Sequence, residues 1–399
     1  MSRVKRLAID GGAPVRNTLL PYGRQSIDEE DIAAVIAVLH SDWITTGPKI
    51  EEFENAVATR VGARYAVAYS SGTAALHGAA FAADLKPGDE AITTPLTFAA
   101  TANCVLYQGA TPVFADVCPD TLTIDPQEVV KRITPRTKAI LPVDYAGHPA
   151  DLDAIREIAD RHQLIVIEDA AHALGATYRE RNVGILNEMT MFSFHPVKHI
   201  TTGEGGMITT NDEMLAQRLR LFRSHGINSD ARKRQEQGGW FYEMIALGYN
   251  YRLTDIACAL GLSQMQKLDA NLRRRREIAA QYTQAFSTMP GIIPPTVRAD
   301  CEPAWHLYPV QVQSEKLKVK RAEIFRALRA ENIGVNVHYI PVHLHPYYRE
   351  RFGYCAGQYP IAEAAYGSLI SLPMFHAMTD KDVEDVIAAV QKVVETFCG

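Results

Sequence analysis

The strongest constraint on the fold is the alternation of short apolar segments with helical segments between residues 65 and 210. Several of these segments, such as LIVIED at 164–169, are apolar at nearly every position rather than at every second one. Continuous apolarity is typical of strands that are covered on both faces, as in parallel sheets. The alternation therefore predicts an α/β domain with helices on both sides of a mainly parallel sheet.

The expected elements of this domain can be placed along the chain. Strands are expected at 65–69, 91–94, 111–115, 138–142, 164–169, 189–194 and 206–210. Helices are expected at 50–61, 72–83, 97–107 and 151–161. Another helix is expected to begin after Ser26, a favoured N-cap residue with Glu29 at capping-box spacing. Residues 1–26 are rich in glycine and proline and predict an extended arm.

Past residue 253 the pattern changes to long helical runs, expected at 253–268 and 271–286. Strands at 305–312 and 335–339, a helix at 319–331, a loop at 341–359 and helices at 361–369 and 380–396 are expected to follow. A chain of 399 residues is long enough for two domains. This second part is therefore interpreted as a smaller α+β domain.

Composition argues against several classes of protein. The formal net charge of −5 gives no basic footprint for nucleic acid, and the arginine run at 273–276 is expected to be a solvated helix face. We find no apolar run of about 18 residues and no apolar signal core, so no membrane association is expected. Six cysteines without a CxxC pair or zinc-type spacing favour a reduced, cytoplasmic location.

A lysine is the first candidate for chemistry, in the segment SFHPVKHITTGEGG at 193–206. Lys198 follows an apolar strand and precedes a glycine-rich turn, a poor setting for a solvated charge. A desolvated lysine has a lowered pKa and can form a Schiff base. A surface-loop lysine explains the stretch equally well.

Three further motifs follow predicted strands. SSGTAAL at 70–76 offers small residues, Ser71, Thr73 and a helix N-terminus to an anion, although Ser71 could simply cap the helix. PLTFAAT at 95–101 carries Phe98, which is either a ring-stacking residue or core. IEDAAHA at 167–173 places Asp169 at a buried strand end, where it needs a cationic partner or caps the next turn.

Two polar clusters lie in the second half of the chain. Asn250 and Arg252 precede a helix that Thr254 could cap. The segment VHYIPVHLHPYY at 337–348 combines histidine and tyrosine, which favours a polar pocket, since it holds no acidic ligand and its prolines break helical spacing. No metal site is predicted.

The carboxyl ends of parallel strands lie at one edge of a sheet, where ligands bind. An anion cradle, an aromatic ring, a carboxylate and a lysine at that edge together match pyridoxal 5′-phosphate. These motifs, with GYNYRLTDIACALG at 248–261, resemble in order those of the DegT/DnrJ/EryC1/StrS sugar aminotransferases over nearly the whole chain.

The resemblance implies a fold-type-I aminotransferase with a mainly parallel seven-stranded sheet, a large domain at 1–262 that includes the N-terminal arm, and a small domain at 263–399. It implies that Lys198 binds the cofactor covalently and that Asp169 pairs with its pyridine nitrogen. It implies phosphate contacts from Gly72, Thr73 and Ser193, and ring stacking by Phe98. His172 departs from the glutamine common in relatives, where the side chain contacts the cofactor's phenolic oxygen.

The resemblance also implies partners. Asn250 resembles the asparagine that reaches the cofactor of a neighbouring subunit, which implies a homodimer with shared active sites. PYGRQSI, SDWITTGP and VNVHYIPVH are most similar to transaminases of the pseudaminic acid pathway, which use a UDP-linked 4-keto sugar and L-glutamate. Substrate contacts are then expected from a set drawn from both halves of the chain: Tyr22, Thr45, Ser71, His338 and Tyr339.

Alternatives remain at this point. A related ketosugar dehydratase carries histidine in place of the lysine, and Lys198 in register with TTGEGG argues against it. Transaminases for 4-amino-4-deoxy-arabinose, perosamine or 3-amino sugars stay open, as does a cofactor-binding regulator without activity. A nicotinamide dehydrogenase is excluded, because no strand leads into a GxGxxG turn.

Overall fold

The computed structural model describes residues 6–229, 234 and 238–398. Its centre is a seven-stranded sheet in the order β1-β9-β8-β5-β4-β2-β3. Only β9 runs antiparallel to its neighbours, so the predicted mainly parallel sheet is confirmed. The strands are β1 (Tyr65–Tyr69), β2 (Glu90–Thr93), β3 (Thr111–Phe114), β4 (Thr137–Leu141), β5 (Ile165–Asp169), β8 (Met189–Ser193) and β9 (Gly206–Thr210).

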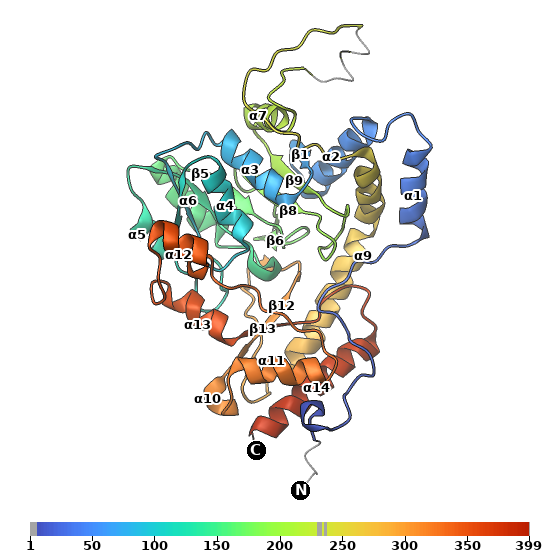
Figure 1. Cartoon of the computed structure of the whole chain (residues 1–399), viewed down its shortest axis with the longest axis vertical. Coiled ribbons are helices and arrows are strands. Elements are labelled where there is room, and N and C mark those ends of the chain that lie inside the picture. The colour runs from blue at the N-terminus through green and yellow to red at the C-terminus, as the bar shows by residue number, and fades with distance from the viewer. Residues whose placement is uncertain (1–5, 230–233, 235–237, 399) are drawn as a thin grey trace.

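Helices cover both faces of this sheet, as Figure 1 shows. One face carries α3 (Gly72–Ala82), α4 (Ala99–Tyr107) and α7 (Glu213–Arg223). The other carries α2 (Pro48–Val61), α5 (Pro126–Arg132), α6 (Leu152–His162) and the first half of α9 (Asp255–Phe286). Successive side chains of one strand enter opposite cores: Met191 packs with α3 and Phe192 with α2. This two-sided burial explains the continuous apolarity of the strands.

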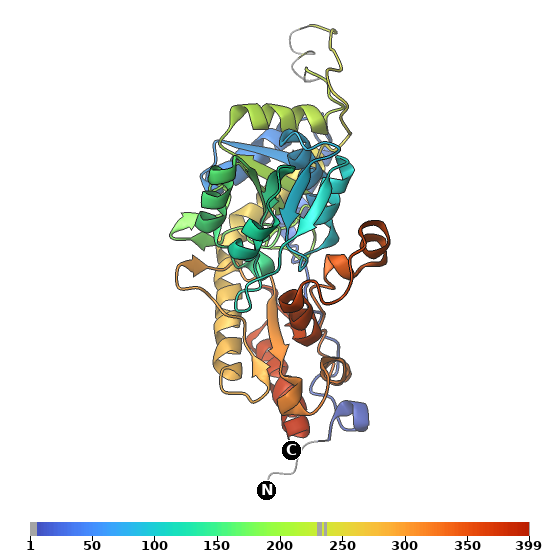
Figure 2. The same ribbon diagram turned by 90° about the vertical axis from the view of Figure 1, so that its left-hand side faces the viewer.

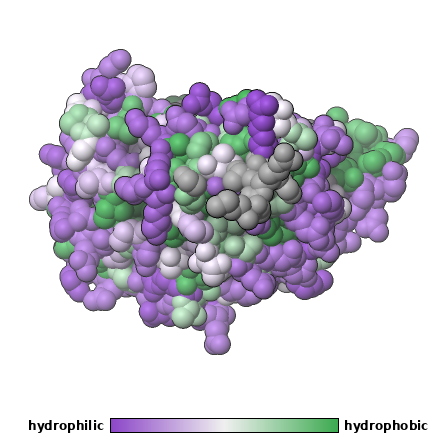
Figure 3. Space-filling model, turned by 90° about the horizontal axis from the view of Figure 1, so that it is seen from below, coloured by the Kyte–Doolittle hydropathy of each residue, from purple (hydrophilic) through white to green (hydrophobic). Residues whose placement is uncertain are grey.

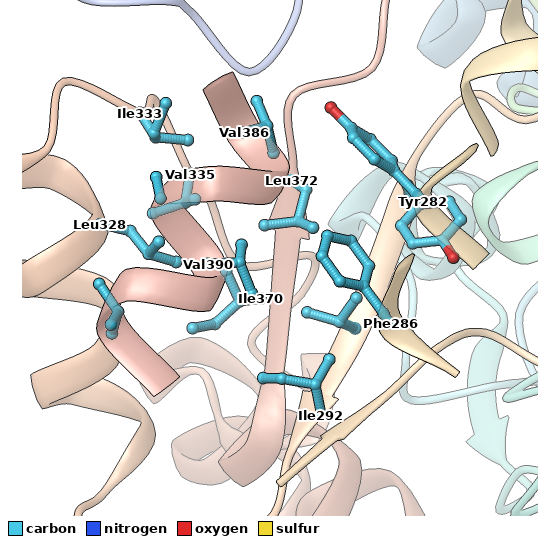
Figure 4. Close-up of a cluster of buried hydrophobic side chains, with 14 of the residues drawn as sticks. Tyr282, Phe286, Ile292, Leu328, Ile333, Val335, Ile370, Leu372, Val386 and Val390 are labelled. Atoms are coloured by element: carbon cyan, nitrogen blue, oxygen red, sulfur yellow. The ribbon is translucent and has the colours of Figure 1, made fainter. Parts of the chain in front are cut away.

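The C-terminal part is built around a three-stranded antiparallel sheet in the order β10-β12-β13. Side chains from this sheet and from the surrounding helices meet in one apolar core, shown in Figure 4. The elements are β10 (Ile292–Ile293), β12 (Tyr308–Val312), β13 (Leu369–Leu372), α10 (Ser314–Leu317), α11 (Arg321–Ala330), α13 (Pro360–Ser368) and α14 (Asp380–Cys398).

Smaller elements complete the fold. They are α1 (Glu29–Leu39), α12 (Pro346–Phe352), a small sheet of β11 (Cys301–Glu302), β6 (Thr177–Tyr178) and β7 (Arg181–Asn182), and the 3₁₀ helices η1 (Ala8–Asp10), η2 (Tyr145–Gly147) and η3 (Val342–Leu344). In the views of Figures 1 and 2, α9 runs from the layered sheet down to the C-terminal part, where both termini lie. Seen from that end, the surface is mostly hydrophilic (Figure 3).

Five local expectations were wrong. The N-cap of α1 is Asp28, which forms a capping box with Asp31, because its carboxylate accepts from two backbone N–H groups that Ser26 does not reach. The two helices expected at 253–268 and 271–286 are one continuous helix, α9. The predicted domain division at 262/263 therefore falls inside α9, and it stays a prediction.

The other three lie in the second half of the chain. Residues 335–339 form no strand, since only Asn336 pairs with a strand, at Ser371. The expected loop at 341–359 contains η3 and α12. The arginine run is not uniformly solvated either, because Arg275 on α9 is fully buried where the helix passes between the two cores.

Close packing of α3 against the sheet depends on a glycine. A Cβ atom at Gly78 would lie 2.2 Å from the Tyr69 hydroxyl oxygen, which is buried and bonded to the Leu219 carbonyl. We therefore predict that Gly78→Ala lowers the free energy of unfolding by about 1–3 kcal/mol, the usual cost of overpacking.

The matched control is Gly367→Ala in α13, where the added Cβ meets open space. It should raise the free energy of unfolding by about 0.5–1 kcal/mol through helix propensity. Urea titration followed by circular dichroism measures both, and equal effects of the two substitutions would contradict the packing argument.

Candidate active site

A cavity of about 560 Å³ opens at the sheet edge where β1, β5 and β8 end. It brings together eleven of the thirteen residues predicted from the sequence: Tyr22, Ser71, Gly72, Thr73, Phe98, Asp169, His172, Ser193, Lys198, His338 and Tyr339. Segments far apart in the chain thus form one site.

Two predicted residues lie outside this cavity. Thr45 is exposed and pairs with Thr254, which caps α9. Asn250 is also exposed and pairs with Ser224 at the end of α7. Neither side chain lines the cavity, so the structure does not bring these two predicted residues to the site.

The cavity wall next to α3 is shaped to accept an anion. Strand register places Gly206 beside both Tyr69 and Ser193, so the ends of β1, β9 and β8 are level. A Cβ atom at Gly72 would lie 3.3 Å from the Ser193 Oγ, so the backbone there comes close to this hydroxyl. Ser71 caps α3 by accepting from the Ala74 N–H at 3.1 Å. The first N–H groups of α3 have no acceptor within the helix and are available to a ligand.

Asp169, at the end of β5, is only 5% exposed, and its carboxylate is well supplied with donors. Thr101 Oγ1 donates to its Oδ2 at 2.6 Å, and the Ala171 N–H donates to its Oδ1 at 3.1 Å. Burial raises the pKa of this carboxyl group, while both hydrogen bonds and the nearby Lys198 oppose the rise. The neighbouring Glu168 points elsewhere and accepts from Asn187 and Thr190.

Lys198 lies on the turn between β8 and β9, whose shape is fixed by hydroxyl groups. Thr201 donates to the Phe194 carbonyl at 3.0 Å and Thr202 to the Glu204 carbonyl at 2.7 Å. Gly203 has a φ of +81°, in the left-handed region that favours glycine. This tight turn directs Lys198 into the cavity, so the surface-loop interpretation was wrong. Burial lowers the pKa of its amine to about 7.

Histidine and tyrosine side chains form the opposite wall. His172 Nε2 is 3.0 Å from the Tyr339 hydroxyl, and burial lowers the pKa of His172 well below its usual range, so the ring is neutral. His172 Nδ1 is buried without a hydrogen-bond partner among the described residues. His338 is bonded to Ser371 through Nδ1 at 2.8 Å, and its ring lies 5.3 Å from that of Tyr22.

Two residues of the site escaped the sequence-based prediction. Thr101 belongs to the PLTFAAT motif, and its position one helical turn after Phe98 was the signal that could have identified it. His306 Nε2 lies 3.3 Å from Lys198 Nζ. It comes from the C-terminal part, and nothing in the local sequence connects it to Lys198.

These groups fit pyridoxal 5′-phosphate. The cradle at Gly72 has room and donors for the phosphate, and Asp169 supplies a carboxylate for the pyridine nitrogen. Phe98 presents its ring to the cavity with 61% of its surface exposed. The unpartnered His172 Nδ1 can hydrogen bond to a polar atom of the ligand.

Two further features were searched for in the described part of the chain: metal sites and membrane-spanning helices. Within the described ranges, no group of three or more His, Cys, Asp or Glu side chains could hold a metal ion. The helices of the described part include none that is both long and apolar enough to cross a membrane.

Comparison with known proteins identifies the family of the chain. Residues 25–391 match the model of the DegT/DnrJ/EryC1/StrS aminotransferase family. The spore coat polysaccharide biosynthesis protein SpsC of Bacillus subtilis is 47% identical over 382 residues, which covers 95% of this chain and 98% of SpsC.

Two solved structures extend the comparison. PseC of Helicobacter pylori, an aminotransferase of pseudaminic acid biosynthesis, superposes with a TM-score of 0.88 at 33% identity, covering 95% of this chain and all of PseC. The PLP form of the sugar aminotransferase Spr1654 of Streptococcus pneumoniae superposes with a TM-score of 0.89 at 30% identity, covering 95% of this chain and 99% of Spr1654. The chain thus belongs to the DegT/DnrJ/EryC1/StrS family and is a pyridoxal-phosphate-dependent sugar aminotransferase.

Proposed function

We propose that the protein transfers the amino group of L-glutamate to C4 of UDP-2-acetamido-2,6-dideoxy-β-L-arabino-hex-4-ulose, giving UDP-4-amino-4,6-dideoxy-N-acetyl-β-L-altrosamine. The observation that carries this proposal is the shared cavity of Lys198 and Asp169 with Tyr22, His338 and Tyr339 beside it. The similarity to PseC over nearly the full chain supports this choice of sugar.

When bound, pyridoxal phosphate supplies an electron sink for the carbon from which a proton is removed. Asp169 is the residue that would hold its pyridine nitrogen in the protonated state. The hydrogen bonds from Thr101 and Ala171 favour the charged carboxylate against the effect of burial. We assign to this pair of donors the task of keeping Asp169 ionised at neutral pH.

Lys198 is the proton carrier in both halves of the proposed reaction. Its amine would take the proton from Cα of glutamate in the first half. In the second half it would return a proton to C4 of the sugar and so set the stereochemistry there. A base works best when its pKa is near the operating pH, and burial brings the pKa of Lys198 to about 7.

We assign the sugar to the wall formed by Tyr22, His338 and Tyr339, with Ser71 as a further contact and Thr45 as a contact contributed by a second copy of the chain. His338 is held through Ser371, and Tyr339 through His172, so these polar groups are oriented before the ligand arrives. Oriented polar groups allow a pocket to discriminate between epimers.

A homodimer with shared sites is part of the proposal. Among the described residues that line the cavity, Lys198 is the sole lysine or arginine, although the diphosphate of the substrate is anionic. The segment before Asn250 projects from the body in Figures 1 and 2. Its apolar side chains are more than half exposed: Trp240, Phe241, Tyr242, Met244, Ile245 and Leu247. Exposed apolar residues in this number favour burial against a second copy, which would then place Asn250 in the neighbouring site.

Alternative functions have less support than this proposal. A dehydratase is disfavoured because Lys198 itself occupies the cavity. An inactive regulator would not need a lysine amine with a pKa near neutrality. Aminotransferases for other nucleotide keto sugars are the nearest alternative.

A cytoplasmic location is also proposed, since all six cysteines are free thiols.

The test of the sugar is direct. Enzyme and glutamate are mixed with each of the two UDP-4-keto-6-deoxy epimers, and the aminated product is identified by NMR. We expect the L-arabino substrate to be aminated at least tenfold faster, and a preference for the other epimer would overturn the assignment. Lys198→Ala should lose the absorbance band of the cofactor covalently bound to the lysine, together with all turnover.

Removing the Thr101 hydroxyl should shift the pH profile. That hydroxyl lowers the pKa of Asp169, so in Thr101→Val the pKa rises and activity is lost at a higher pH as the medium is acidified. A hydrogen bond to a charged group predicts a shift of the acidic limb of kcat by about 1–2 pH units.

The control is Thr97→Val, whose hydroxyl is bonded to Thr101 Oγ1 at 2.8 Å. Since it does not contact Asp169, its shift should be clearly smaller. An acidic limb that stays in place in Thr101→Val would show that another group keeps Asp169 ionised.

Shared sites can be tested by mixing inactive variants. Lys198→Ala and Asn250→Ala subunits, unfolded and refolded together, should regain about a quarter of wild-type activity, because half of the random dimers then contain one intact site. Lys198→Ala mixed with Asp169→Asn should regain none, since one protomer supplies both residues to the same cavity. No recovery in the first mixture would contradict a shared site.

A further inference from the structure

His306 is the side chain in hydrogen-bonding contact with the amine of Lys198. Its Nε2 lies 3.3 Å from Lys198 Nζ, and the residue is only 4% exposed. Its ring also packs against that of His172, with centroids 4.4 Å apart. His306 Nδ1 is buried and has no hydrogen-bond partner among the described residues. Within the described part of the chain, the ring therefore has one direct polar contact, and that contact is the Lys198 amine.

The backbone at His306 is fixed from two sides. Arg275, fully buried on α9, donates from Nη1 to the carbonyls of Trp305 at 3.1 Å and His306 at 3.3 Å. On the other side, a Cβ atom at Gly147 would lie 2.8 Å from the Trp305 nitrogen and 3.0 Å from that of His306.

Trp305 itself has a φ of +54°, in the left-handed region that a tryptophan rarely adopts. Such strain persists only where the surroundings impose it, and it is concentrated at functional sites. The fold thus imposes an unfavourable backbone conformation next to the residue that contacts Lys198.

The electrostatic surroundings of the amine define what His306 can do. Asp169 favours the charged amine and Arg275 disfavours it. Burial and the nearby cations lower the pKa of the surrounding imidazoles, so they are neutral near pH 7; these are His172, His199, His306 and His338. A neutral imidazole offers one acceptor nitrogen. An ammonium group at Lys198 can therefore donate to His306 Nε2.

We propose that His306 is a further catalytic residue, whose Nε2 accepts a hydrogen bond from the Lys198 ammonium group and fixes its direction while the amine carries a proton. The proton taken from the donor amino acid forms an N–H bond on Lys198, and that or another N–H bond breaks when a proton is delivered to the acceptor carbon. His306 neither gains nor loses a proton over the cycle. The assignment rests on the proposed role of Lys198 as proton carrier.

The test measures the apparent pKa of the Lys198 amine. Full-length protein freed of cofactor is acetylated with trace acetic anhydride between pH 5 and 11, and the peptide that contains Lys198 is quantified by mass spectrometry. Only the unprotonated amine reacts, so the profile gives the apparent pKa of Lys198. His306→Phe removes the acceptor and should lower this pKa by about one unit, a tenfold change. His306→Gln retains an acceptor and should restore at least half of the shift.

Steady-state kinetics of the holoenzyme provide the second readout. His306→Phe should lower kcat by about 10²-fold with little change in KM for glutamate, and His306→Gln should recover part of the loss. His195→Phe removes an exposed imidazole at the cavity rim and should leave the Lys198 pKa unchanged. An unchanged Lys198 pKa in His306→Phe overturns the proposal.

If His306→Phe does not fold, NMR of the wild-type protein tests the proposal instead. Histidine labelled with ¹⁵N, with the His306 signal identified by its absence in His306→Gln, should show a neutral ring protonated on Nδ1. A ring protonated on Nε2 could not accept from Lys198 and would overturn the proposal. Because the acetylation profile requires no sugar, a shifted pKa in an enzyme that aminates none of the UDP sugars would refute the proposed substrate and leave the contact standing.

Discussion

Burial of two opposite charges at one edge of the sheet is the constraint on which the site depends. Desolvation disfavours the ionised forms of both Asp169 and Lys198, while each favours the charge of the other. Neighbouring groups affect the charges of these two residues differently. Asp169 receives two hydrogen bonds that hold its negative charge, whereas Lys198 faces Arg275 and neutral imidazoles, so its amine titrates near neutrality. The hydrogen bonds thus favour the charged form of Asp169, whereas the amine of Lys198 is able to exchange a proton near neutral pH.

The cavity needs both parts of the chain. The layered sheet supplies Asp169, Ser193 and Lys198, and the C-terminal part supplies His306 and His338. The continuous helix α9 connects these parts, as Figure 1 shows, and its buried Arg275 binds the backbone that carries His306. The N-terminal arm adds Tyr22, whose carbonyl accepts from the Met374 N–H at 3.0 Å. The proposed substrate site therefore lies where three separate segments of the chain converge.

The elements of the large domain were predicted well because the features that mark them lie in neighbouring residues. Strand ends were placed within one or two residues, since apolar runs and flanking glycines mark a strand that is buried on both faces. Prediction was poorer where pairing depends on distant segments. Residues 335–339 look like a strand, yet they run along the cavity and meet the free edge of β13 in a single bridge, between Asn336 and Ser371. Arg275 was expected to be solvated but is buried. A run of charged residues gives no information on which segments pack against the helix.

By itself the sequence determined the alternating sheet, and it identified Gly72, Asp169 and Lys198 as candidates at the ends of its strands. Each of these follows from residues adjacent in the chain, whose spacing sets local backbone geometry. Only the tertiary structure decided that Thr101 supports Asp169, that Ser371 holds His338 and that His306 meets Lys198. Those contacts join residues 33 to 108 positions apart. They exist because packing of the two cores brings distant backbones within hydrogen-bonding distance, which no local pattern encodes.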